Sequence, residues 1–287
     1  MSRLAYVNGR FVPHGDATVH VEDRGYQFAD AVYEVWNVID GRLADFDGHL
    51  QRLWRSLDEL RIRRPMSAAA LTSVLRETVR RNRLRHGLLY LQVSRGTARR
   101  DHPFPSPEVA PSVVATCKAL DPAAQEAKAR KGVAVVTQPD VRWGRCDIKT
   151  VSLLPNVLAK QAARERGAAE AWLVDDLGLV TEGSSTNAWI VDAEGVLRTR
   201  DTNCNILRGV TRHNLIEIAR EVGVPLSEKP FTVEEAQAAK EAFFTAASAF
   251  LTPVVSIDGK QIGDGKPGPV TTKLRTLYFE RAAENAI

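Results

Sequence analysis

One lysine lies in a largely apolar stretch of sequence. Lys149 belongs to the segment DIKTVSLLPNVLAK and is the only formally charged side chain between Ile148 and Ala159. Lysine is rarely fully buried unless it is paired, and its aliphatic stem often packs on apolar surface while the ammonium reaches water. The alternative is an amine in a dry pocket, where a lowered pKa lets it act as a nucleophile or base. The segment by itself leaves both interpretations open.

Three other stretches carry residue types that can hold a ligand. Glu182, in VTEGSSTNAW, precedes a Gly-Ser-Ser turn, where a solvated loop carboxylate is the ordinary interpretation. In LRGVTRHNL, Gly209 permits close backbone approach and Thr211 can cap a helix, whose free N–H groups and dipole attract anions. In RGTARRDHPFP, Arg100 and His102 share a Pro-rich loop that is either solvated or able to clamp a carboxylate. Each stretch alone is ambiguous.

The composition is that of an ordinary globular protein. The chain has 287 residues, of which 44% are hydrophobic, 26% charged and 7% aromatic. This length fits one large domain or two modest ones. The net charge of +4 comes from 39 basic and 35 acidic residues that are interleaved along the chain. With no long basic block and no nucleic-acid-binding motif, a nucleic-acid partner is not expected.

Cysteine usage and the N-terminal segment predict a cytoplasmic protein. The three cysteines, Cys117, Cys146 and Cys204, form no CxxC motif and do not pair with histidine at metal-ligand spacing. A reduced chain without a metal site is therefore expected. The start, MSRLAYVNGRFVPHG, lacks the apolar core of a signal peptide. No run approaches the roughly 18 apolar residues that span a bilayer, so no membrane association is expected.

Turn and helix patterns predict a mixture of strands and helices in the first part of the chain. Asn8-Gly9 suits a type I′ hairpin turn, and Asp40-Gly41 predicts a second turn. After Asp47, apolar residues recur at helical spacing and predict a helix with this stripe: Leu50, Leu53, Trp54, Leu57 and Leu60. A second helix is expected over residues 68–84, followed by strands in LLYLQVSRG and PSVVATCK.

The second part of the chain predicts a separate domain. Residues 120–131 are polar and alanine-rich, with little to bury, and are expected to form an inter-domain linker. Beyond it, VAVVTQ predicts a strand, and residues 155–166 predict a helix. AWLVDDLGLVTEGSSTNAWIVDAEGVLRT alternates strands with turns, as in an antiparallel meander. We therefore expect an α+β fold with a small domain over 1–119, a linker over 120–131 and a larger domain over 132–287.

Seven blocks, taken in order, resemble one protein family. They are EDRGYQFADAVYEV, GHLQRL, RGTARRDHPFP, RCDIKTVSLLPNVLAKQ, VTEGSSTN, LRGVTR and LTPVVSIDGK. Together the sequence resembles the fold-type IV (class IV) pyridoxal-phosphate aminotransferases, and within them the D-amino-acid branch. The resemblance implies the two-domain fold of that family, with a small N-terminal α/β domain and a larger C-terminal domain rich in antiparallel strands.

The resemblance also implies cofactor-binding residues. Lys149 matches the lysine that carries pyridoxal 5′-phosphate as an internal aldimine, and Glu182 matches the carboxylate that faces the pyridine nitrogen. Arg52 matches an arginine that binds the 5′-phosphate, although helical periodicity alone places it on the solvated face. The remaining matched positions are Leu207, Val210, Thr211, Ala246 and Ala247. The two alanines, in TAASAFLTPV, stand where relatives carry hydroxyl residues.

The substrates implied by the resemblance are D-amino acids and 2-oxo acids. Tyr33, Arg100 and His102 match the residues that hold the substrate's α-carboxylate, and the Arg-x-His spacing favours the D-amino-acid branch. Lys149 would remove and return protons in a ping-pong exchange of the amino group, and the family is expected to form homodimers. A branched-chain L-amino-acid or (R)-amine aminotransferase, and an aminodeoxychorismate lyase, remain alternatives. A basic binding protein would leave the order of the blocks unexplained.

Overall fold

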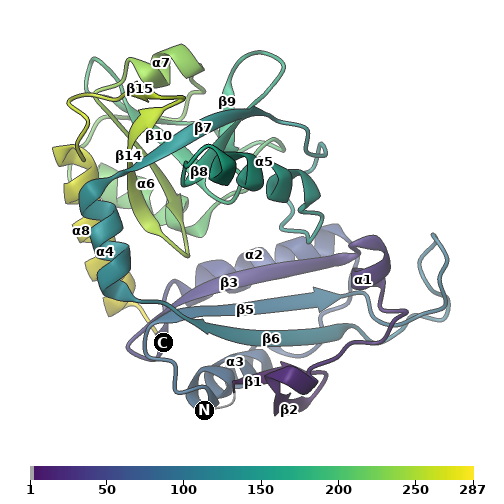
Figure 1. Ribbon diagram of the computed structural model, residues 1–287. Coiled ribbons are helices and arrows are strands. Elements are labelled where there is room, and N and C mark those ends of the chain that lie inside the picture. Colours follow the sequence, from purple (N-terminus) through teal and green to yellow (C-terminus); the bar gives the residue numbers. More distant parts are fainter. Residues whose placement is uncertain (1–2) are drawn as a thin grey trace. The chain divides into compact units, whose positions relative to one another are not determined.

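The computed structural model describes residues 3–287 and forms two compact units (Figure 1). Unit 1 comprises the chain up to Asp121, together with Ile148–Ser152 and Asn285–Ile287. Unit 2 comprises Pro122–Asp147 and Leu153–Glu284. The Lys149 segment therefore belongs to unit 1, although it lies within the sequence of unit 2.

Unit 1 is built on a six-stranded antiparallel sheet with the order β2-β1-β6-β5-β3-β4. Its elements are β1 (Leu4–Val7), β2 (Arg10–Pro13), η1 (His14–Asp16), α1 (Arg24–Phe28), β3 (Ala31–Ile39), β4 (Arg42–Leu43), α2 (Phe46–Glu59), α3 (Ala68–Arg81), β5 (Gly87–Ser94) and β6 (Ser112–Ala119). Both expected tight turns are confirmed. Asn8 and Gly9 have φ of 45° and 93°, and Asp40 and Gly41 have φ of 47° and 79°. These values lie in the left-handed region that such turns require.

Strand β3 separates two sets of side chains because successive residues of a strand point to opposite faces. Val32 and Trp36 join the core formed with Leu53 and Leu57 of α2. Glu34 lies between Val32 and Trp36 on this same face, where it is fully buried. Tyr33 points to the opposite face, where its ring stacks on Tyr90 of β5 at 5.6 Å between centroids. Adjacent residues of one strand thus serve two different environments.

Unit 2 contains a nine-stranded mixed sheet with the order β12-β11-β10-β13-β14-β7-β8-β9, and β15 pairs with β14. Its elements are α4 (Pro122–Lys131), β7 (Val133–Pro139), α5 (Leu154–Glu165), β8 (Glu170–Val174), β9 (Val180–Gly183), β10 (Asn187–Val191), β11 (Leu197–Thr199), α6 (Val210–Glu221), β12 (Leu226–Ser227), α7 (Val233–Gln237), β13 (Glu241–Ala246), β14 (Phe250–Ile257), β15 (Lys260–Gln261) and α8 (Pro269–Glu284). Strand β7 runs parallel to β8 and β14, and β11 runs parallel to β12.

The expected continuous meander is wrong in one respect. β8 pairs with β9 and β10 pairs with β11, as expected, but β13, β14 and β7 lie between the two hairpins in the sheet. Strands β9 and β10 stand far apart in this order, yet only residues 184–186 join them and the two strands are in contact. The sheet therefore curls so that β9 returns beside β10, which brings Glu182 to Asn187.

The expected linker is also different in the structure. Residues 122–131 form helix α4, which packs on β14 within unit 2, and the side chain of Gln125 donates to the Ser248 carbonyl at 3.1 Å. Alanine, lysine, glutamate and arginine all favour helix, and Pro122 at the first turn is compatible with a helix start. The low apolar content of residues 122–131 correctly indicated a segment at the surface. It could not distinguish a surface helix from an extended linker.

Candidate active-site residues

The Lys149 segment extends the edge of β3 in unit 1. The Tyr33 N–H donates to the Lys149 carbonyl at 3.0 Å, and the Val151 N–H donates to the Ala31 carbonyl at 3.1 Å. The Lys149 N–H lies 3.3 Å from the Ser56 hydroxyl oxygen of α2. These contacts of backbone groups fix the position of the lysine backbone. Its amine Nζ lies 4.3 Å from the centre of the Tyr33 ring.

The apolar neighbours of Lys149 in sequence do not form one pocket around it. Ile148 is buried in the core of unit 1, whereas Leu154, Val157 and Leu158 belong to α5 of unit 2. These three residues are 69%, 57% and 61% exposed. Of the two interpretations that the sequence leaves open, a dry pocket built by the local apolar sequence receives no support from these three residues. The neighbour that contacts the amine is the aromatic ring of Tyr33.

Arg52 is held by a buried carboxylate rather than solvated. Its Nε and Nη2 donate to the two oxygens of Glu34 at 2.7 and 2.8 Å, and its side chain is 10% exposed. His49 Nδ1 lies 2.8 Å from Glu34 Oε2. Burial alone would raise the pKa of Glu34, but the charge of Arg52 and hydrogen bonds from Arg52 and His49 lower it to about 2. Burial lowers the pKa of His49, which favours its neutral form.

Arg52 and Ser56 are one turn apart on α2 and therefore face the same side of the helix. Because the Ser56 hydroxyl contacts the Lys149 backbone, this side of α2 carries both the arginine and the support for the lysine segment. Helical periodicity predicted that Arg52 is solvated. This prediction is wrong, because Arg52 is paired with the buried carboxylate of Glu34.

Arg100 and His102 are brought together in the loop after β5. Both side chains are exposed, and both contact the ring of Phe28, which ends α1. The guanidinium carbon of Arg100 is 5.0 Å from the ring centre, and the His102 and Phe28 rings are 5.5 Å apart. Among the ring contacts of residues 3–287, none joins this pair to Tyr33, which the resemblance groups with them.

Glu182, in β9 of unit 2, is buried and accepts several hydrogen bonds. Arg142 Nη1 donates to its Oε1, and Asn187 Nδ2 donates to its Oε2 at 2.9 Å. The Leu207 N–H lies 3.2 Å from both oxygens. Carboxylates that accept several N–H bonds are stabilised in the charged form. The structure thus excludes a freely solvated loop carboxylate at this position.

Arg142 and Asp140 extend this network. Arg142 Nη2 donates to Asp140 Oδ2 at 2.7 Å, and the Thr181 hydroxyl donates to the same oxygen at 2.7 Å. Burial would lower the pKa of Arg142, but the hydrogen bond with Asp140 and the charges of Glu182 and Asp140 raise it. Burial would raise the pKa of Asp140, and Arg142 lowers it overall. One arginine therefore lies between two carboxylates, those of Asp140 and Glu182.

The start of α6 lies beside the Glu182 network. Asn187 Nδ2 also donates to the Leu207 carbonyl at 3.0 Å. A Cβ atom at Gly209 would lie 2.1 Å from Asn187 Oδ1, so only glycine fits this close approach. Gly209 is the N-cap of α6 and no side chain caps the helix. The expectation that Thr211 caps the helix is wrong, because its hydroxyl lies inside the first turn, 3.3 Å from the Tyr278 hydroxyl.

The two alanines lie at the end of β13, near the same elements. Asn187 of β10 pairs with Thr245 of β13, so Ala246 follows directly at the end of this ladder. The Thr245 hydroxyl is buried and accepts from Trp189 Nε1 at 3.0 Å. This bond uses the hydroxyl oxygen as an acceptor and leaves its O–H able to donate. Unit 2 thus brings together Glu182, Leu207, Val210, Thr211 and Ala246 at one end of the curled sheet.

Several residues of these networks were not predicted, among them Glu34, His49, Asp140, Arg142 and Asn187. One indication was available for Glu34, because it occupies a core-facing position between Val32 and Trp36 in an alternating strand. A charge at such a position needs a partner. Arg142 gives no comparable indication of its contact with Glu182, because Asp140 is its only partner nearby in sequence and the others lie in β9 and in the loop before α6.

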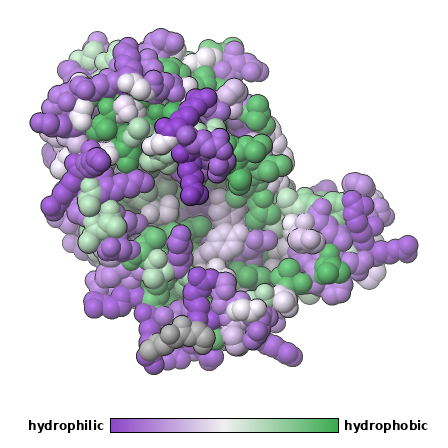
Figure 2. Space-filling view, in the orientation of Figure 1, coloured by the Kyte–Doolittle hydropathy of each residue, from purple (hydrophilic) through white to green (hydrophobic). Residues whose placement is uncertain are grey.

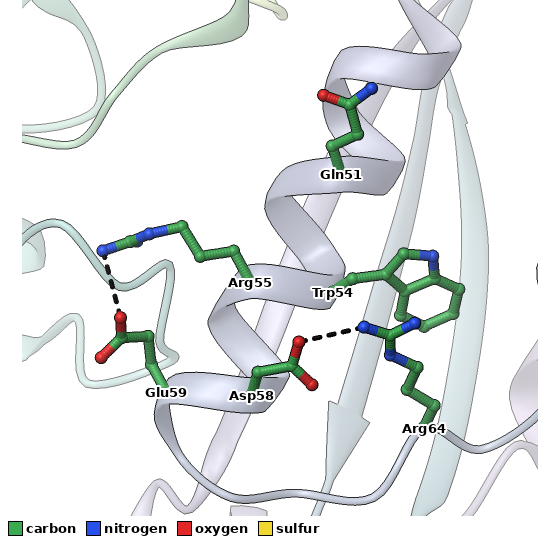
Figure 3. A pocket seen from close by; sticks show the side chains of 6 residues that line it. All are labelled: Gln51, Trp54, Arg55, Asp58, Glu59 and Arg64. Carbon is green, nitrogen blue, oxygen red and sulfur yellow. Dashed lines mark hydrogen bonds and ion pairs between the residues drawn. The ribbon is translucent and has the colours of Figure 1, made fainter.

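A surface groove on α2 is separate from the residues proposed to bind the cofactor and the substrate (Figure 3). It is lined by Gln51, Trp54, Arg55, Asp58, Glu59 and Arg64. Arg64 donates to Asp58 at 3.0 Å and lies over the Trp54 ring, and Arg55 is 3.5 Å from Glu59. Because both arginines are paired with carboxylates of the groove itself, it lacks the character of an anion site.

Two features are absent from the described part of the chain. Over residues 3–287, no helix is long and apolar enough to cross a membrane. Within the same range, no group of three or more histidine, cysteine, aspartate or glutamate side chains is arranged to hold a metal ion.

Sequence comparison identifies the family. Residues 31–257 match the model of amino-transferase class IV. The D-alanine aminotransferase of Bacillus licheniformis is 42% identical over 269 residues, covering 94% of this chain and 93% of that protein. The D-alanine aminotransferase of Staphylococcus haemolyticus is 40% identical over 271 residues, covering 94% of each chain. The chain belongs to the class IV aminotransferases.

Solved structures agree with this assignment. The branched-chain amino acid aminotransferase of Escherichia coli has a TM-score of 0.90 at 25% identity and covers 98% of this chain and 95% of its own. The branched-chain amino acid aminotransferase of Thermoproteus uzoniensis, solved with norvaline, has a TM-score of 0.84 at 29% identity, with coverage of 98% and 94%. The predicted family and its two-domain α+β fold are confirmed.

Proposed function

We propose that this protein is a pyridoxal-phosphate-dependent D-amino-acid aminotransferase that passes the amino group of a D-amino acid such as D-alanine to a 2-oxo acid such as 2-oxoglutarate. The observation that carries the substrate assignment is the pairing of Arg100 and His102 on one aromatic ring. An arginine with an adjacent second donor matches the geometry of a carboxylate. The full-length similarity to D-alanine aminotransferases supports the same assignment.

The residues present fit the cofactor. The start of α6 has no side-chain cap, so the N–H groups of its first turn, at Val210 and Thr211, can donate to a phosphate. Arg52 and the backbone at Leu207, Ala246 and Ala247 complete the proposed cofactor set. When bound, the pyridine ring of the cofactor takes up the electron pair released from the substrate's Cα–H bond.

Each side chain then has a defined task. Lys149 binds the cofactor, and its Nζ accepts the α-proton of the substrate and returns it, which requires the neutral amine. Glu182 faces the pyridine nitrogen and would favour a proton there, while Arg142 and Asn187 hold its carboxylate in place. Tyr33, Arg100 and His102 bind the α-carboxylate. Asp140 keeps Arg142 from neutralising Glu182 completely.

We further infer that the enzyme works as a cytoplasmic homodimer. Hydrophobic side chains gather on the surface where α5 lies (Figure 2), and Leu154, Val157 and Leu158 of this helix are exposed. Burying such residues against a second copy would remove apolar surface from water. Sedimentation of the purified protein tests this, and a monomer at micromolar concentration would contradict it.

A substrate panel tests the function. The purified protein, supplied with pyridoxal phosphate, is assayed with D-alanine, L-alanine, D-glutamate, L-leucine and an (R)-amine, with 2-oxoglutarate as acceptor. We expect D-alanine and D-glutamate to react and L-leucine to react poorly. A preference for L-leucine would identify a branched-chain enzyme, and a preference for the amine would identify an (R)-amine aminotransferase. Release of pyruvate from aminodeoxychorismate without amino exchange would identify a lyase.

A further inference from the structure

The sequence EDRGYQFAD, residues 22–30, has no part in the proposed chemistry. It nevertheless contains a buried arginine that contacts the loop of Arg100 and His102. Arg24 is 4% exposed. Its Nε donates to Asp30 Oδ2 at 2.9 Å. Its Nη1 donates to the Asp101 carbonyl at 2.6 Å, and its Nη2 lies 3.2 Å from the His102 carbonyl. One guanidinium therefore holds the backbone of the two residues that follow Arg100.

Arginine is suited to this arrangement because its donors form a rigid planar fork. One edge meets the Asp30 carboxylate, and the terminal nitrogens reach two successive carbonyl oxygens. A lysine has a single ammonium on a flexible stem and cannot satisfy the three acceptors in the same positions. The position of the loop backbone thus depends on the shape of the guanidinium as well as on its charge.

Phe28 orients the side chains of the same loop. Its ring lies 4.8 Å from the guanidinium carbon of Arg24 and 5.0 Å from that of Arg100. The His102 ring is 5.5 Å away. Cations are attracted to the face of an aromatic ring. A single side chain of α1 therefore holds the two proposed carboxylate-binding residues beside each other.

Arg95 and Phe104 hold the loop before and after Arg100 and His102. Arg95, at the start of the loop, donates to both oxygens of Asp30 at 2.7 and 2.9 Å. Its guanidinium carbon lies 3.6 Å from the centre of the Phe104 ring, which follows His102 in the loop. Asp30 is therefore shared by two buried arginines, and the loop is fixed before and after Arg100 and His102.

We propose that Arg24 and Phe28 are positioning residues that preorganise Arg100 and His102 for the α-carboxylate of the substrate. They set the affinity for amino acids and take no part in proton transfer. The inference rests on the proposed function, because it assumes that the loop binds the carboxylate. It assigns a role to EDRGYQFAD that the chemistry of the cofactor does not require.

Arg24→Lys and Phe28→Leu test this proposal by steady-state kinetics. Loss of one charge-assisted hydrogen bond corresponds to roughly tenfold in affinity. We therefore expect KM for D-alanine to rise about tenfold in Arg24→Lys and about threefold in Phe28→Leu, where only a cation–ring contact is lost. The turnover number should stay within about twofold of wild type, since Lys149 and Glu182 are unaffected.

The matched control is Arg198→Lys. Arg198 donates to the Glu235 carboxylate at 2.8 Å and to the Pro230 carbonyl at 2.7 Å, so it makes the same kinds of bond in unit 2. Its replacement should leave KM unchanged. Equal KM values for wild type, Arg24→Lys and Phe28→Leu would overturn the proposal. A fall in turnover with unchanged KM would also overturn it, because it would indicate only structural damage.

Limited trypsin digestion provides a readout that does not depend on catalysis. The loop contains the cleavable residues Arg99 and Arg100. If Arg24 holds the Asp101 and His102 carbonyls, Arg24→Lys should be cut there several times faster than wild type and than Arg198→Lys. Equal cutting rates would contradict the proposed anchoring. If Arg24→Lys does not fold, the KM of Phe28→Leu decides the question.

A double-variant experiment separates this inference from the proposed function. In an Arg100→Ala background, Arg24→Lys should raise KM much less than in the wild-type background, because both changes act on one interaction. If the effects of Arg24→Lys and Arg100→Ala on KM were fully additive, the two residues would not act on one interaction and the proposal would be overturned. If wild type transaminates D-alanine and Arg100→Ala leaves its KM unchanged, the carboxylate role of the loop is wrong. If Arg100→Ala raises KM and neither positioning variant does, only the present inference fails.

Discussion

Each unit of the molecule contains a buried glutamate paired with an arginine, and the two pairs are built differently. In unit 1, Glu34 is the fully buried partner and has Arg52 and His49 around it. In unit 2, Glu182 shares Arg142 with a second carboxylate, Asp140. The first cluster joins one carboxylate to Arg52 and to His49, whose pKa is lowered by burial. The second joins two carboxylates to one arginine.

This difference agrees with the roles proposed for the two pairs. In unit 1 the carboxylate is enclosed, and it orients an arginine that retains some exposure. In unit 2 two carboxylates share one arginine, and this excess of acidic groups would suit a protonated pyridine nitrogen. A buried ion pair is weak evidence of stability by itself. The supporting residues, rather than the pair alone, therefore separate the proposed anion-binding role of Arg52 from the role proposed for Glu182 beside the pyridine nitrogen.

The largest effect is expected from Lys149→Ala, because it removes the reacting amine that both clusters are proposed to serve. Activity with D-alanine should fall to background, and the visible absorption band of the lysine-bound cofactor should disappear. Lys149→Arg should fail as well, since a guanidinium stays protonated and is neither nucleophile nor base. The control is Lys260→Ala, at an exposed position of β15. Normal turnover by Lys149→Ala would refute the assignment.

Glu182→Gln should produce the next largest effect and affect turnover more than cofactor binding. The amide keeps the shape of the side chain and removes the charge that favours a protonated ring nitrogen. We expect turnover to fall about a hundredfold if a few kcal/mol of transition-state stabilisation are lost. Cofactor content after gel filtration should remain near the wild-type value. An unchanged turnover number would show that the negative charge of this cluster has no catalytic role.

Glu34→Gln tests the other pair and should act mainly on stability. The pKa of Glu34 is about 2 in the folded protein and 4.5 in its reference state. Because the folded value is lower, the stabilisation is present above pH 4.5 and is lost as the pH falls toward 2. A difference of this size corresponds to about 3 kcal/mol. The denaturation midpoints of wild type and variant should therefore differ at pH 7 and converge on acidification.

Glu77→Gln is the matched control for that measurement. The hydrogen bonds from Arg80 and Arg81 also lower the pKa of Glu77 to about 2, but this group lies on the surface of α3. Exposed pairs are weak and screened by salt. The control should destabilise the protein little, and high salt should remove the difference. If Glu34→Gln behaved in the same way, Glu34 would not differ from a surface carboxylate.

The sequence predicted local structure well wherever the residue types directly constrain the backbone. The turns at Asn8-Gly9 and Asp40-Gly41 are confirmed because few conformations suit these pairs. The helix over α2 is confirmed because its apolar stripe has the correct spacing. Thr211 shows the limit of such patterns, since Gly209 begins the helix instead. A shift of two residues in a helix start moves a hydroxyl from the cap into the first turn.

Contacts between residues that are far apart in the sequence could not be predicted from local sequence patterns. Whether Arg52 is solvated depends on Glu34, which lies 18 residues earlier, and nothing in the helix itself indicates it. Arg142 meets Glu182 because β7, β8 and β9 are neighbours in the sheet, which places the segment after β7 close to β9. The inclusion of Ile148–Ser152 in unit 1 depends on hydrogen bonds to β3, which local composition cannot reveal. The resemblance to the family supplied the proposed sites because it contains this long-range information.

The smallest effect is expected at Ala247, where the family resemblance implies a hydroxyl residue. When the cofactor carries the amino group, it has no covalent bond to Lys149, so only non-covalent contacts retain it. The Thr245 hydroxyl accepts from Trp189, and its own O–H can still donate, so Thr245 and Ser248 are the two hydroxyl residues nearby that could replace the missing group. A hydroxyl bond to a charged group contributes roughly 1.5–3 kcal/mol, or about ten- to a hundredfold in affinity. Ala247→Thr should therefore retain more cofactor than wild type after dialysis with an amino donor alone.

The control for this prediction is Ser248→Ala, since Ser248 is exposed at the neighbouring position. If the Ser248 hydroxyl compensates for the alanines, its removal should accelerate the loss of cofactor. If it does not, Ser248→Ala should behave as wild type, and activity should return in every case when pyridoxal phosphate is added. Full retention by wild type, with no gain in Ala247→Thr, would show that the backbone at Ala246 and Ala247, the start of α6 and Arg52 hold the phosphate without a hydroxyl. The arginine oriented by Glu34 would then contribute more to cofactor retention than the comparison of the two clusters suggests.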